Sequence, residues 1–259
     1  MIDAGIPEEA ANFNLTLFET NPTIASNPSD TFTQTKSTQD NEEGSYLFQL
    51  ENHLQTSDGQ TMQISMRCNV PDIVLIDDFM SSNECDELCE LSKGTLTKST
   101  VVDDKTGEGV NHQARTSQGT YFTLAQNNLV EKIEARISEI TGIPAINGEG
   151  IQILNYANGG EYKPHFDYFP DNEGGKNNMA KGGQRIITFV MYLNDVTTGG
   201  ATVFPEINLS IYPKKGSAVY FSYYNAKGEV DPLTLHGGAP VIEGEKWIAT
   251  KWLRQHAYV

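Results

Sequence analysis

The most regular pattern of apolar positions lies after residue 149, where short apolar runs follow one another as GIQILNYA, RIITFVMYL, GSAVYFSYY and KWIATKWLRQ. These runs are rich in Val, Ile, Thr, Tyr, Phe and Trp, and they are separated by Gly, Asn and Pro. That pattern is typical of β-strands joined by turns. Several such strands closing on one another predict a jelly-roll barrel or sandwich.

A helix is predicted to begin at Ser81, directly after the apolar strand VPDIVLIDDF. Glu84 stands three residues further on, at the spacing of a capping box. Cys85 and Cys89 lie one helical turn apart on the apolar stripe, so we expect half-buried packing residues rather than a metal-binding pair. Gly94 is expected to end the helix.

A second helix is predicted after Thr123, with Gln126 in the capping-box position. Gly142 is expected to end it. Its apolar residues recur at helical spacing, at Leu129, Ile133, Ile137 and Ile140. Because helices come first and strands follow, the chain is predicted to be α+β, with both helices packed on a sheet and an all-β C-terminal half.

The first part of the chain has a different composition. Residues 1–65 are rich in Asn, Thr, Ser, Gln and Asp, and we interpret them as a polar, partly ordered N-terminal extension. The alternative is a few strands added to the edge of the main domain, because FNLTLF and SYLFQL both alternate. The main domain is expected to span residues 66–259.

Charge and composition narrow the possible partners and location. The chain has 259 residues and a net charge of −16, which disfavours phosphate backbones, so we expect no nucleic-acid partner and favour a neutral or cationic peptide. No apolar run is long enough to cross a membrane, and MIDAGIPEEAANF has neither a basic leader nor an apolar core, so a cytoplasmic location is expected. Three cysteines argue against a disulfide framework and fit a reducing compartment.

The candidate chemistry lies in YKPHFDYF. His165 and Asp167 stand two residues apart on an extended segment, so their side chains point the same way, and Phe166 is expected to point into the apolar layer. Two histidines and one carboxylate are the ligands of non-haem Fe(II) oxygenases. His236, followed by two glycines in TLHGGAPV, and His256, in the C-terminal tail, are the candidates for the second histidine. We favour His236 and expect His256 to face solvent. Isolated HxD pairs usually bind no metal.

Lys246 adds a second piece of the site. In EGEKWIATKW it shares one strand face with Thr250 and Trp252. If that face is the inner one, a buried cation requires an anion, which a dicarboxylate bound to the iron would supply. The alternative is an exposed lysine, as is expected for Lys251.

From about residue 70 onward the chain resembles the prolyl 4-hydroxylases among the Fe(II)/2-oxoglutarate dioxygenases. The resemblance is carried, in order, by RTSQGTYF, NYANGGEYKPHFDYF, GQRIITFVMYLNDVTTGGATVFPE, YPKKGSAVYFSY and LHGGAPVIEGEKWIATKW. It implies a double-stranded β-helix (jelly-roll) core with supporting N-terminal helices. It also implies Fe(II), 2-oxoglutarate and O2 as cofactors and co-substrates, with ascorbate as reductant.

The resemblance implies specific roles for residues of this sequence. The metal ligands would be His165, Asp167 and His236, and Lys246 would pair with the distal carboxylate of 2-oxoglutarate. Tyr156 and Thr202 would hydrogen-bond the same co-substrate. The peptide side of the site would be lined by Tyr162 and Arg185, expected to be catalytic, and by Arg115, Ser117 and Trp252, expected to bind substrate. Each of these residues has a structural alternative as a strand, turn, core or surface residue. Aspartate at position 167, rather than Ala or Gly, points to hydroxylation instead of halogenation.

The implied reaction is 4-hydroxylation of prolyl residues in a peptide or protein, with release of succinate and carbon dioxide. The alternatives are the same chemistry on another side chain, a free amino acid or a small metabolite, and a non-catalytic jelly-roll binding module. The segment PDNEGGKNNMAKGG is expected to be a mobile lid. Arg254 stands where relatives often have His, which puts peptide contacts there in doubt. The resemblance also suits a bacterial or viral enzyme, and the sequence carries no signal for an oligomeric state.

Overall fold

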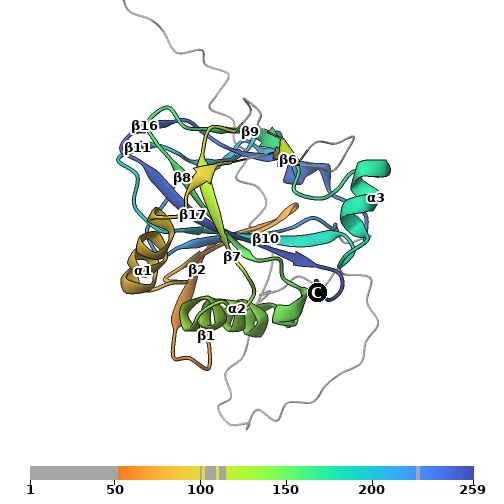
Figure 1. Ribbon diagram of the computed structural model, residues 1–259, viewed down its shortest axis with the longest axis horizontal. Helices are drawn as coiled ribbons and strands as arrows, with labels where there is room; N and C mark the ends of the chain where they lie inside the picture. The colour runs from red at the N-terminus through yellow and green to blue at the C-terminus, as the bar shows by residue number, and fades with distance from the viewer. Residues whose placement is uncertain (1–51, 100, 103–108, 111–114, 226–227) are drawn as a thin grey trace, which may run out of the picture. The chain divides into compact units, whose positions relative to one another are not determined.

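The computed structural model describes residues 52–99, 101–102, 109–110, 115–225 and 228–259. Its largest element is a nine-stranded antiparallel sheet (Figure 1). In spatial order the strands are β1 (His53–Gln55), β2 (Thr61–Asn69), β3 (Asp72–Asp77), β14 (Ala218–Ser222), β10 (Arg185–Tyr192), β17 (Lys246–Arg254), β8 (Ile151–Tyr156), β7 (Gln118–Phe122) and β4 (Thr97–Lys98).

A smaller sheet faces part of the large one, as expected for a double-stranded β-helix, and the predicted α+β fold is confirmed. Its strands, in spatial order, are β13 (Leu209–Ile211), β12 (Thr202–Phe204), β15 (His236–Gly238) and β9 (Tyr162–His165). Two further pairs complete the described strands: β11 (Thr198–Gly199) with β16 (Val241–Glu243), and β5 (Val101–Val102) with β6 (Gly109–Val110).

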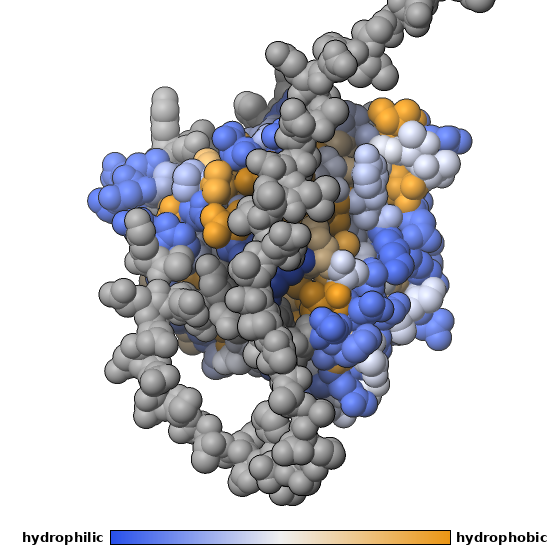
Figure 2. All heavy atoms as spheres, turned by 180° about the vertical axis from the view of Figure 1, so that it is seen from behind, coloured by the Kyte–Doolittle hydropathy of each residue, from blue (hydrophilic) through white to orange (hydrophobic). Residues whose placement is uncertain are grey.

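Helices α1 (Ser82–Lys93) and α2 (Asn128–Thr141) lie together below the large sheet in Figure 1, and α3 (Glu173–Met179) lies at the right of the view, apart from them. In the described ranges, 3₁₀ turns span Ala145–Asn147, Pro205–Ile207 and Pro232–Thr234. Within the described ranges, no helix is long and apolar enough to cross a bilayer. On the face drawn in Figure 2, hydrophilic residues cover much of the described surface and apolar residues form smaller areas among them.

The central strands of the large sheet are buried on both faces, which explains why they read as almost continuous apolar runs. In β10, Phe189 and Met191 belong to the core beneath α1 and α2, whereas Val190 and Tyr192 belong to a second core between the two sheets. The same alternation holds in β17, where Ala249 faces the helices. The jelly roll therefore has two cores that share one sheet.

The first predicted helix is confirmed in detail and the second begins later than predicted. Ser81 caps α1, and it forms the capping box with Glu84. Helix α2 is capped instead by Asn127, whose side-chain oxygen accepts a hydrogen bond from Val130 N at 2.9 Å. Gln126 accepts from the backbone N–H of Thr123 at 2.8 Å, so this pair closes a turn before the helix rather than starting it.

The expected domain boundary between residues 65 and 66 falls inside β2. The β1–β2 hairpin pairs with β3 and extends the large sheet, so residues from His53 onward are part of the main domain. Its turn also contacts α2, because Ser57 N donates to the carboxylate of Glu139 at 2.9 Å. The remainder of the predicted extension, residues 1–51, lies outside the described residues.

Lys251, which was expected at the surface, is buried. Its Nζ lies 2.5 Å from Glu134 Oε1 of α2, and both residues are at most 3% exposed. A Cβ on Gly148 would lie 2.3 Å from Lys251 Cε, so the lysine side chain would have to shift to admit it. The expectation was wrong because β17 is a central strand covered on both faces, where a charge must be paired rather than solvated.

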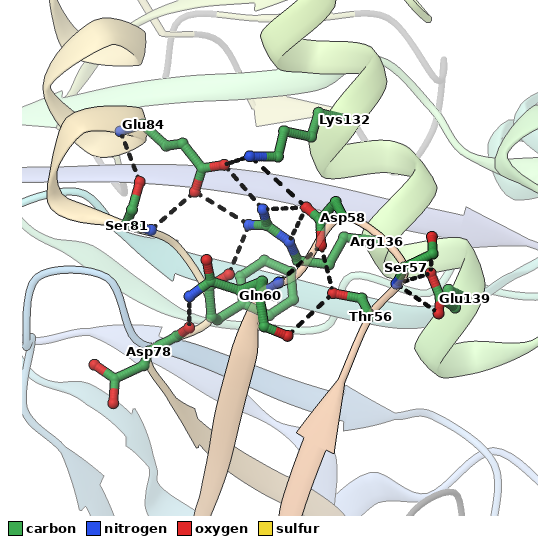
Figure 3. Close-up of polar contacts among 11 residues, drawn as sticks. Thr56, Ser57, Asp58, Gln60, Asp78, Ser81, Glu84, Lys132, Arg136 and Glu139 are labelled. Carbon is green, nitrogen blue, oxygen red and sulfur yellow. Dashed lines mark hydrogen bonds and ion pairs between the residues drawn. The ribbon is translucent and has the colours of Figure 1, made fainter.

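The hairpin and both helices are held together by one buried guanidinium. Arg136 of α2 is fully buried, and its Nη2 lies 2.6 Å from Asp58 Oδ2 in the β1–β2 turn and 2.9 Å from Glu84 Oε1 in α1 (Figure 3). Its Nη1 donates to the carbonyl of Phe79 at 2.7 Å. Burial would raise the pKa of Glu84, but Arg136 and Lys132 lower it to about 2. The arginine thereby fixes three segments at one point.

Replacing Arg136 should therefore destabilise the domain strongly. Arg136→Leu leaves the Glu84 carboxylate buried without its main partner, and we expect a loss of about 3–5 kcal/mol in the free energy of unfolding. Urea denaturation measures it. Lys132→Leu is the matched control: Lys132 lies 2.9 Å from the same carboxylate but is 45% exposed, so its loss should cost about 1 kcal/mol or less. Equal effects of the two changes would contradict the central role of Arg136.

Candidate active site

The pairing of β9 with β15 brings together two histidines that are far apart in the sequence. His165 and His236 are direct partners across this antiparallel pair, and their ring centroids lie 4.5 Å apart. Asp167 follows two residues after His165. The ligand atoms of the three side chains all lie within 4.8 Å of one another, whereas His256 is exposed in the C-terminal tail.

The arrangement of these side chains fits a divalent metal. The carboxylate of Asp167 lies between the histidines, with Oδ1 3.4 Å from His165 Nε2 and Oδ2 3.4 Å from His236 Nε2. Each histidine places Nδ1 2.9 Å from a backbone carbonyl, that of Lys163 or that of Thr234. A carbonyl only accepts, so Nδ1 carries the proton and the Nε2 lone pair is free for a metal.

Burial and charge favour the ligating forms of His165 and Asp167. Burial, together with the neighbouring His236, lowers the pKa of His165, which favours the neutral ring. Burial alone would raise the pKa of Asp167, but the two histidines hold it well below its usual value. Two neutral imidazoles and one carboxylate are the donor set expected for Fe(II).

Phe166 does not point into the apolar layer, as the alternation had suggested. It is 39% exposed, and its ring packs against that of Tyr168 with centroids 4.7 Å apart. Strand β9 ends at His165, so the two-residue alternation no longer applies at the next position. Phe166 lies instead at the wall of the outer cavity.

Two residues that contact the triad were missed in the sequence. Thr188 and Tyr223 each place a hydroxyl 2.9 Å from Asp167 Oδ2, and both are fully buried. The available signal was weak. Thr188 is a polar position inside the apolar run RIITFVMYL, on the same strand face as Val190 and Tyr192, but threonine is also an ordinary strand residue.

Lys246 faces inward and not toward solvent, the alternative that the alternation of β17 had left open. It is 3% exposed and lines an inner cavity next to the triad. Its Nζ lies over the rings of Tyr156 and Tyr192, 5.9 and 5.6 Å from their centroids. Within the described chain no carboxylate forms an ion pair with it, and burial lowers its pKa from 10.5 to about 7. Such a group can bind an anion strongly.

The other two residues predicted to bind the co-substrate line the same inner cavity. Tyr156 and Thr202 both border it and are nearly buried. The hydroxyl of Tyr192 donates to Thr202 Oγ1 at 2.7 Å. Because the Thr202 oxygen already accepts this bond, its own proton is free to be donated to a bound group.

An outer cavity of about 500 Å³ opens from the triad toward the surface. Arg115, Tyr162 and Trp252, which the resemblance assigned to the peptide side, line it. The guanidinium of Arg115 lies over the ring of Tyr162, 4.7 Å from its centroid. Ser117 does not line either cavity. It is buried, and its hydroxyl donates to Ser99 Oγ at 2.9 Å, so it supports the fold rather than the groove.

Arg185 lines the outer cavity, but most of its donors are engaged within the protein. Its Nε and Nη2 donate to the two carboxylate oxygens of Glu149 at 2.6 and 2.8 Å. Its Nη1 donates to the backbone carbonyl of Asp167 at 3.2 Å, and its planar group lies 4.0 Å from the ring centroid of Trp252. Arg185 therefore connects the metal-ligand segment to the wall of the groove.

The segment that was expected to be a mobile lid contains α3 and is fixed at its base. The amide side chain of Gln184 accepts from the N–H of Phe169 and donates to its carbonyl, both at 2.8 Å. Arg254 is 3% exposed and donates to the carbonyls of Gly183 and Asn178 at 2.6 and 3.2 Å. The Gly- and Asn-rich composition of the segment gave no sign of these contacts. Their partners lie outside it: Gln184 directly precedes β10, and Arg254 is the last residue of β17.

Loss of the Arg254 contacts should loosen α3 selectively. Arg254→Leu removes both bonds together with the ion pair between Arg254 Nε and Glu149 Oε1 at 2.8 Å, and a hydrogen bond from a charged donor contributes about 1.5–3 kcal/mol. Amide hydrogen exchange at residues 174–183 should therefore accelerate about tenfold or more, with little change in β8. Lys176→Leu, at an exposed position of the same helix, is the control and should leave the rates unchanged. Acceleration spread evenly over the large sheet would contradict this role.

Comparison with known proteins agrees with this geometry. A family model described as the 2OG-Fe(II) oxygenase superfamily matches residues 151–254, which include the triad and Lys246. The chain is 42% identical to prolyl 4-hydroxylase 5 of Arabidopsis thaliana over 207 residues, which are 73% of this chain and 70% of the relative. It is 35% identical to the probable prolyl 4-hydroxylase 7 of the same plant, over 95% of this chain and 81% of the relative.

Solved structures show the same fold. The viral collagen prolyl hydroxylase of Paramecium Bursaria Chlorella virus-1, solved as a 2OG complex, is 28% identical, with a TM-score of 0.56, over 70% of this chain and 95% of that chain. A Pseudomonas putida prolyl-4-hydroxylase shares the fold at 19% identity, with a TM-score of 0.50, over 70% of this chain and 92% of that chain. The chain therefore belongs to the prolyl 4-hydroxylase family of the Fe(II)- and 2-oxoglutarate-dependent oxygenases.

Proposed function

We propose that the protein hydroxylates prolyl residues of a peptide or protein at the 4-position, consuming O2 and 2-oxoglutarate and releasing succinate and carbon dioxide. The observation that carries this proposal is the position of Lys246, a buried cation without a carboxylate partner in the described chain, beside a triad that fits Fe(II). A binding module that only retained a metal site would have no need of such a lysine.

The residues of the inner cavity would hold the co-substrate. His165, Asp167 and His236 would hold Fe(II), which supplies the oxidising chemistry when it is bound with 2-oxoglutarate and O2. Lys246 would neutralise the distal carboxylate, and Thr202 would donate its hydroxyl proton to it. Ascorbate would serve as the reductant that keeps the metal in its active state.

The residues of the outer cavity would bind the peptide. Its walls carry aromatic rings, and they suit an extended, polyproline-II-like chain that keeps its own backbone groups available. Trp252 is 7% exposed, and its Nε1 has no hydrogen-bond partner among the described residues, so it would donate to a carbonyl of the peptide. Because the pairing of Arg185 with Glu149 occupies most of its donors, Arg185 would act mainly by positioning Trp252 and Asp167.

A direct assay should detect the oxidised peptide. Incubation with Fe(II), ascorbate, 2-oxoglutarate and a panel of proline-rich peptides should produce succinate and a mass gain of one oxygen on proline. His165→Ala should abolish both, because it removes a metal ligand, whereas His256→Ala, at an exposed histidine, should retain them. Succinate without oxidised proline would leave the oxygenase in place but point to a different substrate. The absence of both products would contradict the proposal.

The affinity for 2-oxoglutarate should depend on the charge of Lys246. Burial lowers the pKa of free Lys246 to about 7, and a bound carboxylate would raise it. Affinity is therefore full below about pH 7 and should fall as the pH rises, by up to tenfold per unit. Calorimetry of the Mn(II)-loaded protein between about pH 7 and 9 measures it. Lys246→Met should bind weakly at every pH, and an equally flat profile in the unmodified protein would contradict this role.

A further inference from the structure

The way in which Asp167 binds the metal determines how many positions remain for the reaction. An octahedral ion has three positions left when two histidines and one carboxylate oxygen are bound. If both carboxylate oxygens bound, one of those positions would be lost. 2-Oxoglutarate and O2 together require all three in the proposed function, on which this inference rests. The protein must therefore keep one carboxylate oxygen away from the metal.

The two oxygens of Asp167 have different partners in the structure. Both face a histidine Nε2 at 3.4 Å, so the histidines alone do not distinguish between them. Oδ2, however, also lies 2.9 Å from the hydroxyl of Thr188 and 2.9 Å from that of Tyr223. Donation from these hydroxyls makes Oδ2 the poorer metal ligand of the two oxygens. Among the described residues Oδ1 accepts from no hydroxyl, so it is the oxygen left to bind a metal.

Both hydroxyls are held in place by the large sheet. Thr188 lies in the middle of β10, is fully buried and pairs with Phe221 of β14. Tyr223 follows β14, and its backbone is fixed on both sides, since its N–H donates to the carbonyl of Ile186 at 3.0 Å and its carbonyl accepts from Asp231 N at 2.7 Å. The two hydroxyls also contact each other. They form a rigid pair behind one edge of the carboxylate.

We propose that Thr188 and Tyr223 are positioning residues that hold Asp167 as a one-oxygen ligand through Oδ1 and so keep the third open metal position available. Neither residue borders the inner or the outer cavity, so neither is placed to contact the co-substrate or the peptide. Any effect of these two residues on the binding of the co-substrate or the peptide would act through the carboxylate of Asp167.

The test uses binding rather than turnover. Mn(II) accepts the same donor set, and calorimetry gives its dissociation constant and then that of 2-oxoglutarate for the Mn(II)-saturated protein. Thr188→Val and Tyr223→Phe should each weaken Mn(II) binding about 10–100-fold, as is usual for partners behind a metal ligand. They should also weaken 2-oxoglutarate binding at saturating Mn(II), because the released Oδ2 competes for its position.

Matched variants separate positioning from structural support. Thr188→Ser keeps the hydroxyl and should retain both affinities. Tyr220→Phe removes a buried tyrosine hydroxyl on β14 that lies 3.4 Å from Asp72, in the other core, and it should also leave both affinities unchanged. A crystal structure of the Mn(II)-loaded Thr188→Val/Tyr223→Phe double variant should show both oxygens of Asp167 on the metal.

Several outcomes would overturn the inference. One is Mn(II) and 2-oxoglutarate affinities of both variants within about twofold of the unmodified protein. Another is a double variant in which Asp167 still binds through one oxygen. If the unmodified protein bound no Mn(II) at all, this inference and the proposed function would fail together, whereas normal binding with unaffected variants would overturn the inference alone.

Discussion

The register between β9 and β15 is the constraint on which the site depends. It sets His165 directly opposite His236, and a slip of one residue would turn one of the two rings to the other face of the sheet. The neighbouring glycine helps to fix it, because a Cβ on Gly237 would lie 2.8 Å from the carbonyl of Tyr162. The close approach of two backbones thus gives the metal site its geometry.

The buried charged side chains are of two kinds: some are paired and support the fold, and one is unpaired among the described residues and suited to bind a ligand. Arg136 and Lys251 both lie in the interior beneath the helices, and each is paired with a carboxylate of a neighbouring element. Lys246 lies on the same strand as Lys251 but on its other face, where the structure places no carboxylate in reach among the described residues. Paired interior charges connect elements, and an unpaired one is suited to bind an anion.

Short sequence patterns correctly predicted the features that depend only on neighbouring residues, such as the start of a helix or the residues that share one face of a strand. The alternation along β17 placed Lys246 and Trp252 on one shared face, and the capping box placed the start of α1. Predictions failed where a distant segment decides the outcome. Lys251 is buried because α2 supplies Glu134. The contacts of Arg254 with the carbonyls of Gly183 and Asn178 could not be predicted either, because Arg254 lies on a distant strand. Ser117 lies within RTSQGTYF, the stretch that resembles the peptide side of the family's site, but its hydroxyl donates to Ser99, which lies outside that stretch.

The metal centre and the groove are mechanically one unit. The carboxylate of Asp167 is held by β10 and by the residue after β14, and its backbone carbonyl is held by Arg185, which also stacks on Trp252 of β17. A displacement of the groove wall would therefore be transmitted to the metal ligand through a single guanidinium. Because a misplacement of about 1 Å can cost two orders of magnitude in rate, the pairing of Arg185 with Glu149 bears on the chemistry through the position that it gives to the guanidinium.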